Sequence, residues 1–425
     1  MRIWIVREGE PLPGGIANGR LMRSGMLATL FAQLGSEVVW WSSTYLHYEK
    51  RYAFLSTTVV DVDKNLSLFL LHSKNGYRKN ISLKRIRYSK DLGKTFREES
   101  KLHQKPDIIY CSWPIIDFAY EAVRYGKEHS IPVVIDIRDL WPDTFIQPFP
   151  KLLKPLAKIG INIIFKRKVS YVMQNATVVI GIIPKFLKLA ESYGRNLRPQ
   201  DHVVHHSYNN TPVSDMERQQ ADSYWKEQGL TQDQCVVSYI GSISNRIGDF
   251  DTLLEAARQC DDPSIKFVFC GAGGYLDEVK RLTNGLSNVV LSGYRGRAEI
   301  QSLLKLSTFG LLSYRNTDDF IDSLPNKFGE YLSEGLVILT SLKGDSRRIL
   351  EEEHCGAYYS DAQTLLAAIN NLKGNTQLLE TMSKNALGLY HREFDASKVY
   401  HDFYKFLKSL ARDFKKEQGR TVDHA

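Results

Sequence analysis

The chain has 425 residues, of which 43% are hydrophobic and 11% aromatic, and this apolar content excludes a disordered or low-complexity protein. Its 56 lysines and arginines exceed its 48 acidic residues and give a formal net charge of +8. The length is typical of two domains, and the five widely spaced cysteines, none in a C-x-x-C pattern, predict neither a disulfide framework nor a zinc site.

The hydropathy pattern predicts no membrane span. The first residues, MRIWIVREGEPLPGG, reach the charges of Arg7 and Glu8 before they could form the apolar core of a signal peptide. No apolar run approaches the ~20 residues that are needed to cross a bilayer. We therefore expect a cytoplasmic protein that is soluble or lies peripherally on the cytoplasmic face of a membrane.

Short β-rich runs alternate with helical patterns through the first half, which is typical of parallel α/β layers. Arg2–Val6 is the first expected strand, and a Pro/Gly loop and a helix from about Gly19 to Leu34 follow it. Further strands are expected at 37–43, 57–61, 66–72, 107–113, 132–139 and 176–182. This order predicts a Rossmann-like domain over residues 1–210.

A polar stretch follows, and we expect residues 211–232 to form a linker region. The second alternating series has expected strands at 235–241, 265–271, 288–293, 309–314, 336–341 and 356–360. It predicts a second Rossmann-like domain over residues 233–390, followed by a basic amphipathic helix within 391–425. Ligands of open α/β sheets bind at the carboxyl ends of the strands, so we expect the functional site there.

Residues 323–335, SLPNKFGEYLSEG, form the most informative stretch. Ser323 is expected to cap a short helix, Pro325 to stand in its first turn, and Gly335 to end it. Free N–H groups beside Lys327 would suit a diphosphate, and Glu330 could accept hydrogen bonds from a ribose diol. The alternative is an ordinary capped helix with solvated charges.

Three other loops follow predicted strands. Gly14 and Gly15 form either a flexible turn or a close approach to a phosphate or sugar. Gly273 lies in a Gly-rich loop, CGAGG, that indicates close packing somewhat more than ligand contact. Arg138 and Asp139 place charges at the carboxyl end of a buried strand, where charges are more often functional than solvated.

Two segments combine basic and apolar residues. They span residues 74–97 and 151–168, and such mixtures either lie on an anionic membrane or form domain helices with a solvated basic face. Nucleic acid is not an expected partner, because no recognised nucleic-acid module accompanies the charge.

Four segments resemble the family 4 glycosyltransferases of bacterial surface-polysaccharide synthesis, and more narrowly the fucosamine-transferase-like subgroup. They are RDLWPD at 138–143, WWSS at 40–43 followed by His47, GYRKNISLKR at 76–85 and PNKFGEYL at 325–332. The resemblance implies a GT-B fold with two Rossmann-like domains that face each other across a cleft and a C-terminal helix that crosses back to the first. It also implies a nucleotide-sugar donor on the second domain, an acceptor on the first, retention of anomeric configuration and no required metal or other cofactor.

The resemblance also implies roles for individual residues. The family's Glu-x7-Glu motif falls on Asp322 and Glu330, and the loop from Ser323 to Lys327 would hold the diphosphate. The implied catalytic residues are Arg138, Asp139, Asp322 and Lys327. The implied donor-binding residues are Gly14, Gly15, Ser242, Arg246, Gly273, Tyr294, Arg295, Ser323, Asn326, Lys327 and Glu330, with Tyr294 and Arg295 beside the nucleobase. The implied acceptor-binding residues are His47, Arg78 and Lys79.

This sequence departs from the family pattern at two places. Ser242 and Ile247 occupy the positions where the family's phosphate-binding Gly-Arg…Lys-Gly pattern has basic residues, and Arg246 stands one place away. Many members also carry a histidine where this chain has Arg138.

From the residues and the resemblance together we expect a retaining glycosyltransferase that moves a sugar from a UDP-linked donor to a lipid-linked glycan of capsule or O-antigen synthesis. We also expect peripheral contact with the anionic inner membrane. The alternatives are a sugar-nucleotide epimerase with the same two-domain plan and a non-catalytic assembly subunit.

Overall fold

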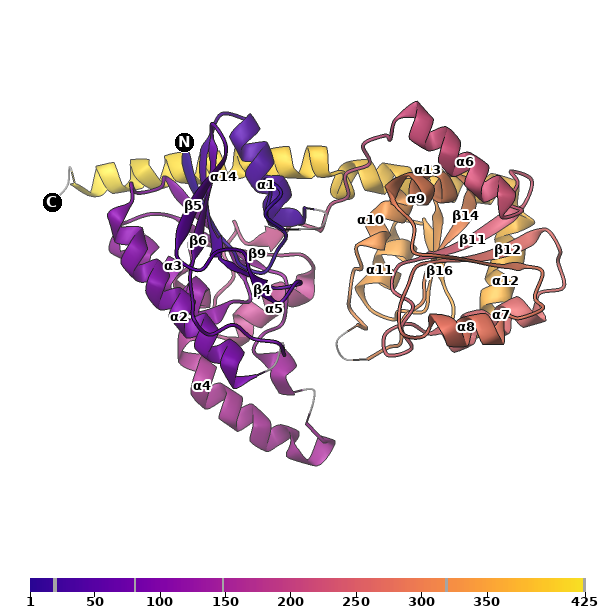
Figure 1. The fold of residues 1–425 in the computed structure, drawn as a ribbon, viewed down its shortest axis with the longest axis horizontal. Helices are drawn as coiled ribbons and strands as arrows, with labels where there is room; N and C mark the ends of the chain where they lie inside the picture. The colour runs from indigo at the N-terminus through magenta and orange to yellow at the C-terminus, as the bar shows by residue number, and fades with distance from the viewer. Residues whose placement is uncertain (18–20, 80–81, 147–148, 318–319, 423–425) are drawn as a thin grey trace. The chain divides into compact units, whose positions relative to one another are not determined.

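The computed structural model describes residues 1–17, 21–79, 82–146, 149–317 and 320–422 (Figure 1). Its contacts divide the chain into two compact units. Unit 1 comprises Met1–His205 and Tyr400–Ala425, and unit 2 comprises His206–Val399.

Unit 1 contains an eight-stranded sheet in the order β10-β9-β8-β7-β1-β2-β6-β5. Its strands are β1 (Arg2–Val6), β2 (Glu37–Ser43), β5 (Thr58–Asp63), β6 (Leu66–Leu71), β7 (Ile108–Trp113), β8 (Val133–Ile137), β9 (Val178–Gly181) and β10 (His202–Val203). All pairs are parallel except β5 with β6. A short hairpin of β3 (Tyr45–Leu46) and β4 (Arg51–Tyr52) follows β2. Strands β7 and β8 are buried along their whole length, which explains their nearly continuous apolar sequences.

In the described ranges, unit 1 also contains six helices and three single turns. They are α1 (Arg23–Gln33), α2 (Leu83–Glu99), η1 (Ser100–Leu102), α3 (Ile116–Glu128), η2 (Asp143–Ile146), η3 (Lys151–Leu153), α4 (Lys154–Asn175), α5 (Pro184–Ser192) and most of α14 (Ala396–Val422). The helix predicted from about Gly19 to Leu34 is present as α1, which begins at Arg23 because the backbone of Met22 is extended (φ −92°, ψ −175°); Gly19 itself lies outside the described residues.

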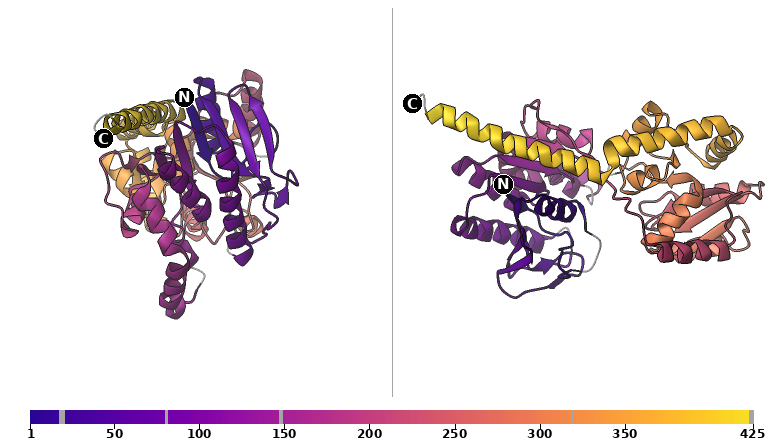
Figure 2. Two further views of the ribbon diagram at one scale, coloured as in Figure 1. Left: turned by 90° about the vertical axis from the view of Figure 1, so that its left-hand side faces the viewer. Right: turned by 90° about the horizontal axis from the view of Figure 1, so that it is seen from above.

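The C-terminal helix α14 packs on unit 1, as predicted. It begins in unit 2 and continues without a break along unit 1 (Figure 2, right). The Phe403 ring lies 5.5 Å from that of Tyr110, and the Tyr404 hydroxyl lies 2.8 Å from the Ser36 hydroxyl. These contacts are with strand β7 and with the turn before β2, so α14 is part of the unit 1 core.

Unit 2 contains a six-stranded parallel sheet in the order β13-β12-β11-β14-β15-β16. Its strands are β11 (Cys235–Ile240), β12 (Ile265–Cys270), β13 (Val289–Gly293), β14 (Ser307–Leu312), β15 (Val337–Thr340) and β16 (Gly356–Tyr358). Its helices are α6 (Asp215–Glu227), α7 (Phe250–Gln259), α8 (Leu276–Leu282), α9 (Arg297–Leu306), α10 (Lys327–Leu332), α11 (Asp345–Glu352), α12 (Ala362–Lys373), α13 (Thr376–Leu389) and η4 (Tyr390–Phe394). The six strands have the Rossmann order, and so do six consecutive strands of unit 1.

Residues 211–232, expected to form a linker region, contain helix α6. Ser214 and Glu217 form a capping box at its start, and Trp225 Nε1 donates a hydrogen bond to the Glu299 carbonyl of α9 at 2.7 Å. The segment is polar in sequence because only Ala221 and Trp225 of this helix are buried. It belongs to unit 2.

The five cysteines are free, as the spacing predicted. Within the described ranges, no helix combines the length and the apolarity needed to cross a membrane.

Candidate functional site

Both sheets have a switch point, where the strand order reverses. It lies between β1 and β7 in unit 1, and between β11 and β14 in unit 2. Ligands of open α/β sheets bind in the crevice beyond the strand ends at such a point. The predicted site residues fall mainly on the loops that follow these strands and their neighbours.

In unit 2, Lys327 is buried beside the switch point at the first residue of α10. Among the described residues its Nζ has no hydrogen-bond partner, although only 8% of Lys327 is exposed. The ammonium lies 3.6 Å from the ring centroid of Tyr239 and 5.1 Å from that of Tyr314. Burial lowers the pKa of Lys327 to about 7, against the opposing influence of Glu330. A buried cation without hydrogen bonds is costly, so this environment favours an anionic ligand.

The backbone of Gly241 lies beside this ammonium. Gly241, directly after β11, has φ +126°, and a Cβ there would lie 3.1 Å from Lys327 Nζ. A Cβ on Gly271 would lie 1.7 Å from the Gly241 carbonyl oxygen, and one on Gly273 would lie 2.2 Å from that of Ile243. The Gly-rich loop after β12 therefore packs against the loop after β11, which agrees with the packing interpretation of this motif.

The start of α10 differs from the prediction. The expected Ser323 cap is wrong, because the helix begins at Lys327 with Asn326 at the N-cap and no side-chain cap. Ser323 instead lies in a preceding turn, where its N–H donates to the Phe320 carbonyl at 2.8 Å and its carbonyl accepts from the Ser346 hydroxyl at 2.7 Å. The Ser323 hydroxyl is buried and makes no hydrogen bond to any residue that the structure describes.

The other predicted donor residues of unit 2 lie on α10 and on the loops that follow the strands. Glu330 is half-buried in the first turn of α10. Asp322 is also half-buried, next to Gly344 on the loop after β15. Ser242, Arg246 and Asn326 are exposed. Their contact with a donor stays a prediction.

The predicted nucleobase neighbours stand after β13. Tyr294 is 80% exposed, whereas the Arg295 guanidinium lies over the Tyr224 ring at 4.2 Å and donates from Nε to the Ser292 carbonyl at 3.0 Å. Tyr294 therefore presents an open aromatic face, while the aromatic contact of Arg295 is made within the protein.

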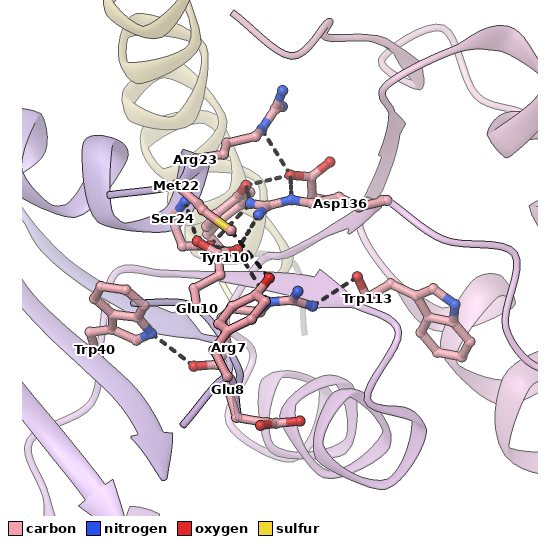
Figure 3. Close-up of polar contacts among 12 residues, drawn as sticks. Arg7, Glu8, Glu10, Met22, Arg23, Ser24, Trp40, Tyr110, Trp113 and Asp136 are labelled. Atoms are coloured by element: carbon pink, nitrogen blue, oxygen red, sulfur yellow. Dashed lines mark hydrogen bonds and ion pairs between the residues drawn. The ribbon is translucent and has the colours of Figure 1, made fainter. Parts of the chain in front are cut away.

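In unit 1, the switch point contains a buried network of charges (Figure 3). Arg138, just after β8, donates from Nε to Asp136 at 2.8 Å and from Nη2 to Tyr110 at 2.6 Å. Its Nη1 donates to Glu10, and its Nη2 also lies 3.1 Å from the Ser24 hydroxyl. All three guanidinium nitrogens of Arg138 are thus engaged within the protein.

Arg23 completes this network from α1. Its Nε lies 3.0 Å from Asp136, and its Nη1 donates to the carbonyls of Val204 and His205, each at 2.8 Å. Although burial alone would raise the pKa of Asp136, Arg23 and Arg138 lower it to about 2. Asp136 is therefore ionised near neutral pH and pairs with two arginines.

The network gives Arg138 a structural role that its sequence position did not indicate. The predicted contact of Arg138 and Asp139 with the sugar or acceptor stays a prediction, and Asp139 is half-buried directly after the network. Sequence reasoning did not select Glu10, Arg23 or Tyr110. The available signal was the pair of acidic residues, Glu8 and Glu10, in the loop directly after the first strand.

The predicted acceptor residues lie near one pocket of unit 1. Arg78 and Lys79 are exposed and line this pocket. His47 Nδ1 lies 2.6 Å from the Tyr77 hydroxyl, and burial lowers the pKa of His47 to about 4, so the imidazole is neutral at pH 7. Gly14 and Gly15 are exposed with φ of +78° and +75°, which favours glycine.

The described part of the chain contains no candidate metal site. No cluster there contains three or more His, Cys, Asp or Glu side chains placed to hold an ion.

A protein-family model matches a large part of unit 2. A family model described as "Glycosyl transferases group 1" matches residues 234–375, which include Gly241, Tyr239, Lys327 and Glu330. Residues 234–375 form a glycosyltransferase domain. The prediction of a glycosyltransferase is confirmed at this level, while the fucosamine-transferase-like subgroup stays a prediction. No curated protein was found to be related to this chain in sequence.

Solved structures of glycosyltransferases share the two-domain architecture. Sucrose-phosphate synthase from Thermosynechococcus elongatus is 14% identical, with a TM-score of 0.68 over 96% of this chain and 98% of that one. HepE from Anabaena, in complex with UDP, is 15% identical, with a TM-score of 0.63 over 96% and 100%. WaaG, a glycosyltransferase involved in lipopolysaccharide biosynthesis, is 13% identical, with a TM-score of 0.60 over 96% and 99%. At these identities the likeness establishes the fold, and the predicted GT-B class is confirmed.

Proposed function

We propose that this chain transfers a sugar, with retention of configuration, from a nucleotide diphosphate sugar to a lipid-linked glycan of a bacterial surface polysaccharide. The observation that carries the donor half is the buried ammonium of Lys327 at the unit 2 switch point. HepE was crystallised with UDP and with UDP-glucose, which supports a uridine nucleotide. WaaG acts in lipopolysaccharide biosynthesis, which supports the acceptor class.

The chemistry of transfer explains a buried lysine. When the anomeric bond breaks, negative charge develops on the diphosphate, and a preorganised cation in a water-poor site stabilises that charge more than an exposed one would. Lys327 lies beside the backbone of Gly241, which has no side chain to prevent the close approach of a phosphate oxygen. We propose that this lysine replaces a metal, and that Glu330 binds the ribose.

The donor proposal predicts a thermal shift. With a chelator present, UDP or UDP-sugars should raise the melting temperature of the wild-type protein, whereas Glu330→Ala should lose most of this shift. Glu334→Ala is the matched control, because Glu334 lies just past the end of α10 and contacts the Asn210 side chain at 2.9 Å. A shift that needs a divalent metal, or no shift with UDP, ADP or GDP compounds, would contradict the proposal. Conversion of a nucleotide sugar without acceptor would favour the epimerase.

We also propose that η3 and the N-terminal half of α4 contact the membrane. This part of α4 projects from the remainder of unit 1 (Figure 1). Leu152, Leu156 and Ile163 are 92%, 67% and 79% exposed, and Lys151, Lys154 and Lys158 lie among them. Large exposed apolar side chains interleaved with lysines are typical of segments that bind anionic lipid surfaces.

Membrane contact predicts salt-sensitive cosedimentation with vesicles. The wild-type protein should bind vesicles with anionic lipid, with less binding at high salt, because each basic residue near the surface contributes about 1 kcal/mol. Leu152→Glu/Leu156→Glu should reduce binding at least tenfold. Leu55→Glu changes an 84% exposed leucine elsewhere in unit 1 and should leave binding unchanged. Equal binding by all three proteins would contradict the proposal.

A further inference from the structure

A basic pocket of about 460 Å³ opens on the surface of unit 1. Its lining includes five cationic side chains, those of Lys50, Lys74, Arg78, Lys79 and Lys84, and three tyrosines, Tyr45, Tyr52 and Tyr77. None of the described residues that line it is acidic. Like charges repel when they are held together, so this pocket complements a ligand with several negative charges.

The start of α2 adds to the positive potential of the basic pocket. The first turn of this 17-residue helix contains Lys84 and Arg85 and no acidic residue. Basic side chains are unfavourable at a helix N-terminus, where the helix dipole is already positive, and an anion bound there would offset both effects.

An apolar cavity of about 210 Å³ lies on the other side of the start of α2. Leu83, Ile86, Ile116, Phe145, Ile161 and Ile164 contribute to its wall. The hydroxyl of Ser89 and the carboxylate of Asp117, which also line it, are bonded to each other at 2.9 Å. A cavity of about 150 Å³ with apolar walls is enough to bind benzene, so this one is large enough for part of a hydrocarbon chain.

The basic pocket and the apolar cavity are adjacent. Ser82 lines both, and then Leu83 lines the cavity while Lys84 lines the basic pocket. The Arg85 guanidinium lies between them, 4.9 Å from the Tyr77 ring of the basic pocket and 4.5 Å from the Trp141 ring of the cavity. A charged compartment and an apolar compartment thus meet within one helical turn.

We propose that these two compartments form one binding site for a lipid diphosphate, in which a diphosphate group carries a hydrocarbon chain. The diphosphate binds the cations of the basic pocket, and the first part of the hydrocarbon chain enters the apolar cavity. This inference rests on the proposed function, because it assigns the carrier of the acceptor glycan to particular residues. It extends the predicted acceptor role of Arg78 and Lys79 to a two-part site.

Farnesyl diphosphate, below its micelle concentration, is a suitable probe. Calorimetry, together with the fluorescence of Trp141 in the cavity wall, should show that it binds at least tenfold more tightly than either inorganic diphosphate or farnesol. Arg78→Gln/Lys79→Gln should weaken the binding of farnesyl diphosphate and of inorganic diphosphate at least tenfold. The affinity for farnesol should stay unchanged. Leu83→Gln/Ile164→Gln should weaken the binding of farnesyl diphosphate and of farnesol. The affinity for inorganic diphosphate should stay unchanged. Leu83 and Ile164 are 73% and 55% exposed, so these variants should fold.

Two controls test the location of this site. Lys94→Gln changes a cation of α2 outside the basic pocket, and Leu55→Gln changes an 84% exposed leucine outside the cavity; both should bind farnesyl diphosphate like the wild type. The proposal would be overturned if the control variants lost as much affinity for farnesyl diphosphate as the site variants. It would also be overturned if the wild type bound farnesyl diphosphate no more tightly than inorganic diphosphate or farnesol. A nucleotide thermal shift without farnesyl diphosphate binding would remove this inference and leave the donor proposal standing. Farnesyl diphosphate binding that persists in Lys327→Met would show that the lipid site is separate from the donor site.

Discussion

Replacing Lys327 with methionine should weaken nucleotide diphosphate binding about 10- to 100-fold and should stabilise the unliganded protein at pH 7. A hydrogen bond to a charged group contributes about 1.5–3 kcal/mol, which accounts for the loss of affinity. The gain in stability follows because the fold lowers the pKa of Lys327 to about 7, so the buried ammonium is a cost to the native state. Calorimetry with UDP and thermal melting of the free protein measure the two effects.

The pH dependence provides a sharper test of Lys327. Between about pH 7 and pH 10 the unfolded chain binds the lysine proton while the native state releases it, so wild-type stability rises with pH across this window. Below pH 7 both states hold the proton, and this group adds no further dependence. UDP binding should weaken as pH rises above 7, since the neutral amine no longer attracts phosphate. Both trends should be absent in Lys327→Met and present in Lys305→Met, which changes an exposed lysine of α9. Identical pH profiles in all three proteins would refute the assignment.

Replacing Asp136 with asparagine should destabilise unit 1 by about 3–5 kcal/mol, because removing one partner of a buried ion pair leaves an uncompensated charge. Asp136 accepts from Arg138 at 2.8 Å and lies 3.0 Å from Arg23, so the change leaves both arginines without this carboxylate. Urea unfolding followed by tryptophan fluorescence suits this test. Five of the six tryptophans, Trp4, Trp40, Trp41, Trp113 and Trp141, lie in unit 1, so the signal reports mainly on that unit.

Low pH should reduce the contribution of Asp136 to the stability of unit 1. Its pKa is lowered to about 2 in the native state, so the stability that it contributes is present above about pH 4 and is lost as pH falls toward 2. The difference between wild type and Asp136→Asn should therefore shrink over that range. Glu98→Gln removes one partner of an exposed ion pair with Lys94 in unit 1 and should change stability little at any pH. An Asp136→Asn effect as small as this control would show that the network does not stabilise unit 1.

Much of the fold could be predicted because parallel strands buried on both faces have nearly continuous apolar sequences. Strand β1, for example, has the predicted bounds, and β7 and β8 differ from their predicted ends by one or two residues. Helix α6 was missed because a helix that buries only Ala221 and Trp225 has little apolar periodicity. The hairpin of β3 and β4 was missed because strands of two residues carry no alternating pattern.

The candidate site was predictable where one short segment determines it. Lys327 and Glu330 were predicted from residues 323–335 alone, and the structure places both in the first turn of α10, while their contact with a donor stays a prediction. The network around Asp136 was not predictable, because Glu10, Arg23 and Tyr110 come from three distant segments that only the folded sheet brings together. The same holds for the basic pocket, where Lys50 and Lys84 come from different elements.

The division of the chain also determines the order in which its parts can fold during synthesis. Unit 2 is inserted into unit 1, which needs both Met1–His205 and the segment from Tyr400 onward. A ribosome therefore completes all of unit 2 before it releases Phe403, which packs on Tyr110, or Tyr404, which packs on Phe31. Until then the N-terminal sheet carries apolar surface that α14 will cover, and such exposed surface promotes aggregation. Packing of the C-terminal helix is thus the last step in the folding of unit 1. A nascent chain halted before residue 400 would contain every residue of unit 2 but would lack the helix that completes unit 1.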